Sequence, residues 1–228
     1  MDTVEWEAIR LSLVVAAWAV AASLPAATLM AWLLARGRFP GRTLLDALVH
    51  APLVLPPVVV GYLLLVLLGA RGTLGGWLAE HLGVRLVFTT AGASVASAVM
   101  AFPLMVRAIR LSIDGIDRGL ETAARTLGAG RVGTFCCVTL PLMLPGLLSG
   151  AIVAFAASLG EFGATITFVS NIPGETRTLP LAIYTATQTP GGDAAAARLV
   201  AIALGLAVAA LALSGVAERR VQAWLGRG

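Results

Sequence analysis

Lysine is absent from this chain of 228 residues, so all 16 of its Lys and Arg positions are arginines. This excludes the Gly-Lys-Ser/Thr phosphate-binding loop, Schiff-base chemistry and a lysine general base, so any energy source must lie elsewhere. Charged residues make up only 12% of the chain, whereas soluble domains carry about a quarter. Because 58% of the residues are hydrophobic, the composition is typical of a protein that faces lipid and argues against a soluble enzyme.

Cysteine and histidine are also scarce. Cys136 and Cys137 are adjacent in the sequence, whereas His50 and His81 lie far apart. Since this is no plausible zinc-ligand spacing, we expect no metal or cofactor bound by the chain. There is no Ser/His/Asp set and no pair of acids within one apolar run, so we expect no catalytic residues. The arginines form no basic face interleaved with aromatic side chains, which argues against a nucleic-acid partner.

Five uncharged stretches are long enough to cross a bilayer, because a helix needs roughly 20 apolar residues to span about 30 Å of hydrocarbon. These predicted spans are residues 11–35, 47–70, 86–106, 132–160 and 199–217. The predicted fold class is therefore all-α, a polytopic membrane protein with about five transmembrane helices. We interpret the segments 162–173 and 178–192 as a partly embedded external region. The sequence leaves open whether residues 162–192 contain a further embedded helix.

The arginines outside the predicted spans define an orientation, because positive charge is retained on the cytoplasmic side. One side carries eleven of the 16 arginines and the other carries five. This predicts an external segment at residues 1–8, one membrane domain over 9–217 with a cytoplasmic loop at 107–131, and a cytoplasmic tail at 218–228. No arginine lies within a predicted span. The acidic start and the long apolar run after it argue against a cleavable signal peptide.

Six prolines interrupt the second, third and fourth predicted spans, with Pro56 and Pro57 in the densest cluster. A proline removes a backbone donor and disturbs the turn before it. In lipid, such a broken turn persists only where protein or water satisfies the freed carbonyls. The prolines are therefore either kinks that serve packing or irregular backbone that lines a pathway. Pro56 and Pro57 are the pathway candidates.

Residues 117–128, in the predicted cytoplasmic loop, carry the signals of a short helix outside the membrane. Asp117 can cap its start, Glu121 and Arg125 are four residues apart in the favourable order, and Gly128 can end it in a left-handed turn. One helix face is apolar, formed by Leu120, Ala123, Ala124 and Leu127. Because two to three turns are unstable alone in water, we expect this helix to dock against another surface.

One set of residues resembles, in its spacing, the EAA loop of ATP-binding-cassette (ABC) importer permeases. It consists of the pair Ala123-Ala124, Gly128 and the run Val138-Thr139-Leu140-Pro141. In that family the loop forms a coupling helix that sits in a groove of the ATPase subunit. Thr122 stands where the motif has its glutamate, and Glu121 lies one position earlier. The resemblance implies that the ATPase-coupling residues are Leu120, Glu121, Ala123, Ala124, Leu127 and Gly128.

Further blocks resemble the molybdate permease branch of this family, namely residues 52–62, 102–107, 158–165, and 174–180 together with 188–192. The resemblance implies a type I ABC importer permease fold in the inner membrane. It also implies a homodimer, two copies of a P-loop ATPase that uses ATP and Mg, and a periplasmic molybdate-binding protein. Tungstate or sulfate is the alternative cargo. An ion-coupled secondary transporter is a distant alternative, since the chain lacks the paired ionisable residues and inverted repeat expected of one.

Glu161 is an acid that directly follows the predicted span 132–160. A carboxylate facing an anion would repel it, so Glu161 either pairs with a partner at an external gate or lies in water at the interface. Phe162 and Thr165 complete the gate or pathway candidates with Pro56 and Pro57. We expect alternating access, in which the coupling helix moves with the ATPase and the gate near Glu161 and Phe162 opens towards the loaded binding protein.

Overall fold

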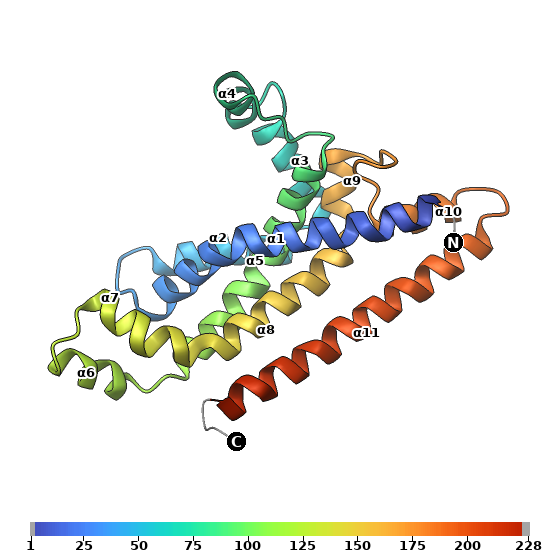
Figure 1. The fold of residues 1–228 in the computed structure, drawn as a ribbon. Helices are drawn as coiled ribbons and strands as arrows, with labels where there is room; N and C mark the ends of the chain where they lie inside the picture. The colour runs from blue at the N-terminus through green and yellow to red at the C-terminus, as the bar shows by residue number, and fades with distance from the viewer. Residues whose placement is uncertain (1–2, 225–228) are drawn as a thin grey trace.

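The structure, a computed structural model, describes residues 3–224, with side-chain surroundings given for all of these except residues 214, 217–219 and 221–224. The predicted external segment and cytoplasmic tail include residues 1–2 and 225–228, which lie outside the described residues. Every regular element between residues 3 and 224 is a helix (Figure 1). The all-α prediction is therefore confirmed.

The helices follow one another along the chain with short connections. They are α1 (Thr3–Arg36), α2 (Arg42–Val54), α3 (Pro57–Leu68), α4 (Thr73–Leu82), α5 (Thr90–Asp114), α6 (Arg118–Thr126), α7 (Arg131–Thr134), the π-helix η1 (Phe135–Thr139), α8 (Leu140–Leu159), α9 (Gly163–Val169), α10 (Leu179–Thr187) and α11 (Asp193–Trp224). The elements α7, η1 and α8 form one continuous helical run.

Four helical stretches are long and apolar enough to cross a membrane: Thr3–Arg36, Thr90–Asp114, Arg131–Leu159 and Asp193–Leu213. A fifth crossing exists if α2 and α3 together count as one span. The predicted span 86–106 is shifted, because the α5 helix begins at Thr90 and continues to Asp114. Residues 162–192, left open by the sequence, contain the two short helices α9 and α10.

The predicted span 47–70 is a bent pair of helices rather than one straight helix, with 114° between α2 and α3. Leu55 and Pro56 both have extended backbone, with ψ angles of 141° and 134°. Each of them precedes a proline, whose ring disfavours helical backbone in the residue before it. Pro57 then starts α3 at a first-turn position, where its missing N–H costs nothing. The Pro56-Pro57 pair therefore causes the bend.

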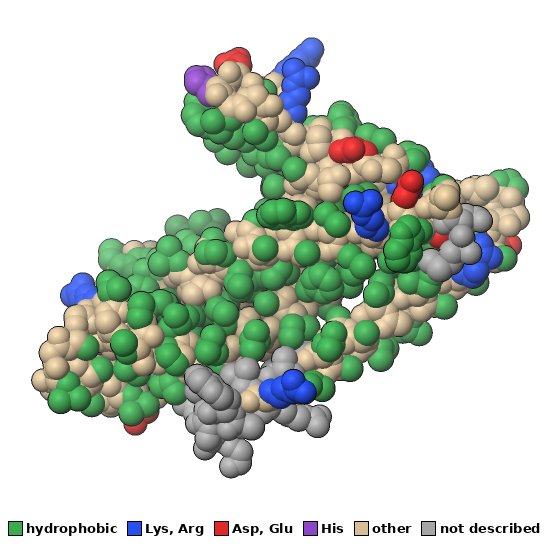
Figure 2. All heavy atoms as spheres, viewed as in Figure 1, with side chains coloured by type: hydrophobic (Ala, Val, Ile, Leu, Met, Phe, Trp, Pro, Cys, Tyr) green, Lys and Arg blue, Asp and Glu red, His purple; other side chains and the backbone are tan. Residues whose placement is uncertain are grey.

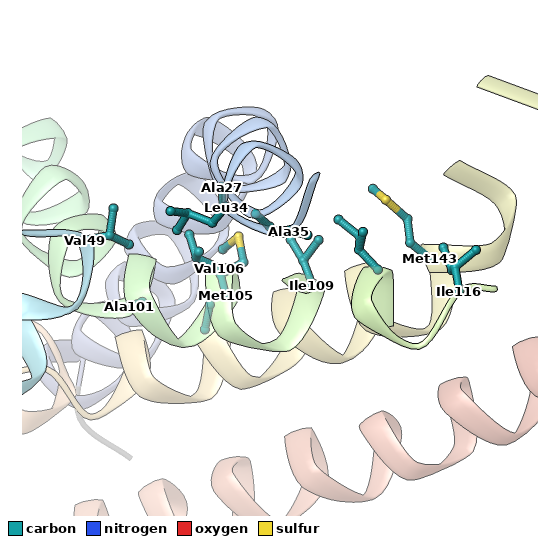
Figure 3. Packing of buried hydrophobic residues seen from close by; sticks show 13 residues of the cluster. Ala27, Leu34, Ala35, Val49, Ala101, Met105, Val106, Ile109, Ile116 and Met143 are labelled. Carbon is teal, nitrogen blue, oxygen red and sulfur yellow. The ribbon is translucent and has the colours of Figure 1, made fainter. Parts of the chain in front are cut away.

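The main core lies where α1, α5 and α8 pack lengthwise against one another, with α2 at one side (Figure 3). Leu34 of α1, Met105 and Ile109 of α5, and Met143 of α8 are fully buried there. Small residues allow close approach, since a side chain at Gly146 of α8 would collide with Ser112 of α5. Close packing of this kind drives helix association in lipid, where burial from water contributes little.

The surface is apolar along the sides of the bundle, and charged side chains gather at its ends and on the projecting arm of α4 (Figure 2). Large apolar residues such as Leu29 and Leu204 are each 65% exposed. The helix α11 runs along the outside of the bundle beside α8 (Figure 1). This distribution matches a polytopic membrane protein, with apolar sides for lipid or a partner and polar ends for water.

Candidate functional site

The predicted docking helix is present as α6 and protrudes at one end of the bundle (Figure 1). The Asp117 carboxylate caps its start by accepting a hydrogen bond from the Gly119 amide at 2.8 Å. Gly128 follows the helix with a φ of 91°, a left-handed conformation that favours glycine. The local signals in residues 117–128 therefore produce the expected short helix.

The apolar face of α6 is open in this chain. Leu120 is 46% exposed and Leu127 is 89% exposed, while Ala123 is exposed and Ala124 is half-buried. We call these four residues the docking face. The helix is otherwise polar, so an uncovered apolar stripe at its surface is suited to contact with another protein.

Glu121 lies on a different side of α6 from the docking face and is buried. Its Oε1 atom accepts hydrogen bonds from Arg36 Nε at 3.2 Å and from Thr139 Oγ1 at 3.0 Å. The structure thus pairs Glu121 with Arg36 of α1, whereas the sequence spacing had suggested Arg125. Arg36 also donates through Nη2 to the carbonyls of Ile113 and Ile116, at 3.0 and 3.4 Å.

We call Arg36, Glu121, Thr139 and these two carbonyls the inner junction. The side chains of Arg36 and Glu121 are each only 11% exposed. Removing one partner of a buried ion pair leaves the other charge uncompensated, which costs roughly 3–5 kcal/mol. The junction therefore ties α6 to the end of α1, the end of α5 and η1. Sequence reasoning missed it, because Arg36 lies 85 residues from Glu121 and no local pattern links them.

The π-helix η1 supplies Thr139 to the junction. Pro141 lies in the first turn of α8, directly after η1. A proline ring collides with the carbonyl four residues earlier in a regular α-helix and donates no hydrogen bond to it. The wider π turn between Phe135 and Thr139 accommodates this proline, and such insertions often occur at functional positions.

The gate candidates come together from distant parts of the sequence. Gly163, at the start of α9, lies so close to α3 that an added Cβ atom would be 2.8 Å from Pro57 Cβ. At Gly61 of α3, a Cβ atom would be 2.6 Å from the Ala164 carbonyl oxygen. We call this contact between α3 and α9 the gate contact. It places the Pro56-Pro57 bend against the segment that carries Glu161, Phe162 and Thr165, and the two glycines that permit it were not singled out from the sequence.

Glu161 lies two residues after the end of the candidate span Arg131–Leu159, and its side chain caps the first turn of α9. Its Oε1 atom accepts a hydrogen bond from the Ala164 amide at 2.8 Å. Burial raises the pKa of the Glu161 carboxyl above its ordinary value of 4.5, and hydrogen bonds from backbone amides such as that of Ala164 partly oppose this. In this conformation Glu161 holds the turn before α9.

Phe162 and Thr165 have different surroundings. The Phe162 ring lies 5.3 Å from the ring of Tyr184, measured between centroids. Both rings line an apolar cavity of about 690 Å³ between α8, α10 and α11. Thr165 is fully buried, and its hydroxyl has no hydrogen-bond partner within the described part of the chain. Over the same residues, no three His, Cys, Asp or Glu side chains are grouped as metal ligands.

Comparison with known proteins identifies one family of transport proteins. Residues 23–223 match the family described as "Binding-protein-dependent transport system inner membrane component". The molybdenum transport system permease protein ModB of Escherichia coli K12 is 60% identical over 210 residues, 92% of each chain. The ModB protein of Haemophilus influenzae is 54% identical over 98% of each chain. The sulfate transport system permease protein CysT of Escherichia coli K12 is 40% identical over 85% of this chain and 70% of its own length.

Solved structures show the same fold at low sequence identity. A chain of a bacterial alginate ABC transporter, in complex with an alginate-bound periplasmic protein, superimposes with a TM-score of 0.77 at 17% identity, covering 97% of this chain and 80% of that one. An amino acid ABC transporter gives a TM-score of 0.65 at 18% identity, covering 95% and 94%. The chain therefore belongs to the inner membrane components of binding-protein-dependent transport systems and has the fold of ABC importer permeases.

Proposed function

We propose that this chain is the membrane-spanning permease subunit of an ATP-driven importer that carries molybdate across the inner membrane. The observation that carries this proposal is its 60% identity, over 92% of both chains, with a permease named for molybdenum transport. This subunit contributes the path for the anion and the surface that couples to the ATPase. ATP hydrolysis, with its Mg, belongs to a partner chain.

The proposed partners are a second copy of this chain, two P-loop ATPase subunits and a periplasmic molybdate-binding protein. Four or five crossings of a 23.4 kDa chain are too few to enclose a gated path for an oxyanion. Two copies around a two-fold axis would enclose it between them. The exposed docking face of α6 is the surface offered to the ATPase, because it is apolar, protrudes from the bundle and is held from behind by the inner junction.

The proposed orientation has the N-terminus outside and the C-terminus in the cytoplasm. In support, α6 lies at the same end of the bundle as α7 (Figure 1), and α7 starts at Arg131. The connections at that end carry most of the arginines, as the retention of positive charge in the cytoplasm predicts. The opposite end carries α9, α10 and the gate contact, which would then face the periplasm and the binding protein.

The mechanism that we propose is alternating access driven through α6. When the ATPase subunits close, the docked α6 moves, and the inner junction transmits this movement to α1, α5 and η1. The continuous run of α7, η1 and α8 leads from the junction to Glu161, which caps α9. Movement along α8 would therefore shift α9 against the Pro56-Pro57 bend and open or close the gate contact. A shift of this kind requires that the ATPase contact α6 differently in its two states.

Sulfate is the cargo that competes most directly with molybdate, because a sulfate permease is 40% identical to this chain. The test is uptake of radiolabelled molybdate by proteoliposomes that contain the permease, its ATPase and its binding protein. We expect excess unlabelled molybdate to suppress the signal fully and excess sulfate to leave most of it, with tungstate acting like molybdate as a similar tetrahedral anion. Suppression by sulfate alone would reassign the cargo.

A further inference from the structure

A pocket with charged residues in its wall lies between α2 and α5, outside the coupling and gate regions. It has a volume of about 550 Å³ and is lined by five ionisable side chains. These are Asp46, His50, Arg107, Arg110 and Asp114. The lining residues belong to α2 and to the last two turns of α5, so the pocket is near the end of the bundle where α5 leads into α6 (Figure 1).

The position of the two arginines is informative. Hydropathy ended the third predicted span at residue 106, which left every arginine outside the spans. The structure instead places Arg107 and Arg110 on α5, whose whole length from Thr90 to Asp114 forms one candidate membrane span. Ionisable residues on a spanning helix are costly, face protein or water, and commonly mark the path of an ion or substrate.

Arg110 is already neutralised by carboxylates. Its Nη1 atom donates to both oxygens of Asp46, at 2.9 and 3.0 Å. Its Nε atom is 3.6 Å from Asp114 Oδ2. The two acids of the pocket are thus both engaged by one arginine, which links α2 to α5 as a structural clamp.

Arg107 is the side chain of the pocket that is left with free donor capacity, whereas His50 uses its ring N–H on Asp46. Arg107 is exposed and has no ion pair or hydrogen bond with any residue from 3 to 224. His50 Nδ1 is 2.8 Å from the Asp46 carbonyl oxygen and 3.2 Å from Asp46 Oδ1. Both neighbours are acceptors, so Nδ1 carries the proton.

We propose that Arg107, in this pocket, forms an inner transit site for a tetrahedral oxyanion, a deepening that rests on the proposed function. A guanidinium presents several N–H donors in a fork that matches two oxygens of such an anion. The two arginines and two aspartates of the pocket cancel in formal charge, so binding is weak. Weak binding suits a site from which the anion must leave.

The test uses the whole importer in proteoliposomes, with radiolabelled molybdate and the loaded binding protein outside. Arg107→Gln removes the charge from an exposed residue that has no ion pair among the described residues. We expect the initial uptake rate at limiting cargo to fall about tenfold, the loss that follows from one charge-assisted hydrogen bond. Arg107→Lys should restore at least half of the rate, because it keeps the positive charge. Arg38→Gln, an exposed arginine outside the pocket, is the matched control and should stay within about twofold of wild type.

Two results separate this inference from the proposed function. If the wild-type importer takes up no oxyanion at all, the proposed function fails. If the wild type imports molybdate and Arg107→Gln imports it equally well, the proposed function stands and the inner transit site is wrong. Equal losses in Arg107→Gln and Arg107→Lys would also overturn the site, because they would show that the charge is not what the position contributes.

Discussion

The two ends of this permease are held together by different forces. At the coupling end, a buried ion pair and hydrogen bonds to backbone carbonyls join four elements through Arg36, Glu121 and Thr139. At the gate, α3 and α9 meet through glycines, with backbone against backbone at Gly61 and Gly163. The buried Thr165 hydroxyl nearby has no hydrogen-bond partner among residues 3–224.

This difference in the contacts suits the two ends to different tasks, the transmission of movement at the coupling end and opening at the gate. A polar junction with fixed donor and acceptor geometry makes α6 move together with the helices behind it, because breaking the junction is costly. A contact made by van der Waals packing can separate more readily, and opening it to water would give the orphaned Thr165 hydroxyl a partner. We infer that the coupling end transmits movement and the gate yields to it.

The largest expected effect is at the docking face. Ala124→Arg places a long cationic side chain where the ATPase groove must make close contact, and we expect uptake to fall about a hundredfold, since a desolvated, unpartnered charge costs several kcal/mol. The measurement is uptake in proteoliposomes, together with copurification of the ATPase. Thr122→Arg is the matched control, because Thr122 is exposed on the face of α6 away from Leu120 and Leu127. Unchanged uptake in Ala124→Arg would refute the docking assignment.

The inner junction gives the next effect. Arg36→Ala leaves Glu121 buried without its counter-charge and should lower the free energy of unfolding by about 3 kcal/mol. Thermal unfolding of the purified permease measures this, and Arg38→Ala, an exposed neighbour, should change little. The double variant Arg36→Ala with Glu121→Gln should recover part of the loss, because it removes the stranded charge. Additive losses in the double variant would show that the pair is not coupled.

The gate contact should respond to a single methyl group. Gly61→Ala adds a Cβ atom 2.6 Å from the Ala164 carbonyl oxygen, so α3 and α9 must separate. We expect about 1–3 kcal/mol of strain and an uptake rate roughly tenfold lower. Gly205→Ala in α11 is the control, since nothing lies within 4 Å of its added atom. If both variants transport normally, the gate contact is not tight in the working importer.

The smallest effect concerns Glu161. Burial raises the pKa of its carboxyl in the folded chain, so the ionised form is penalised and stability is lost as the pH rises through that pKa. Glu161→Gln keeps an acceptor for the Ala164 amide without the charge. We expect the variant to be more stable than wild type at pH 8, with the difference vanishing as the pH falls below 4.5. Thermal unfolding across this pH range measures it, with Glu80→Gln on the exposed part of α4 as a control. A constant difference would contradict the account.

Local features of the fold could be predicted from the sequence, and contacts between distant segments could not. Asp117 and Gly128 mark the two ends of α6 through short-range hydrogen bonding and backbone conformation, so that helix was predictable. The proline pair indicated a disturbed second span. Its 114° bend results from both prolines acting in succession, and the packing of α9 against α3 joins segments about 100 residues apart.

In the candidate site, too, contacts between distant segments could not be predicted from the sequence. The role of Glu121 depends on Arg36, 85 residues away, and spacing within α6 suggested Arg125 instead. The hydropathy of the sequence ended the predicted third span before Arg107, because a hydropathy average includes the charge of an arginine but not the carboxylates that pair with it in the fold. In the structure, the ion pairs of Arg110 with Asp46 and Asp114 allow the α5 helix to continue.

The most direct test of the account asks whether transport depends on a separate motor. Proteoliposomes with the purified permease are assayed for molybdate uptake with and without the ATPase, in the presence of ATP and the loaded binding protein. We predict uptake only when the ATPase is present and hydrolysing ATP, and none under an ion gradient alone. Uptake by the permease without the ATPase would contradict the central claim that movement enters this chain through α6.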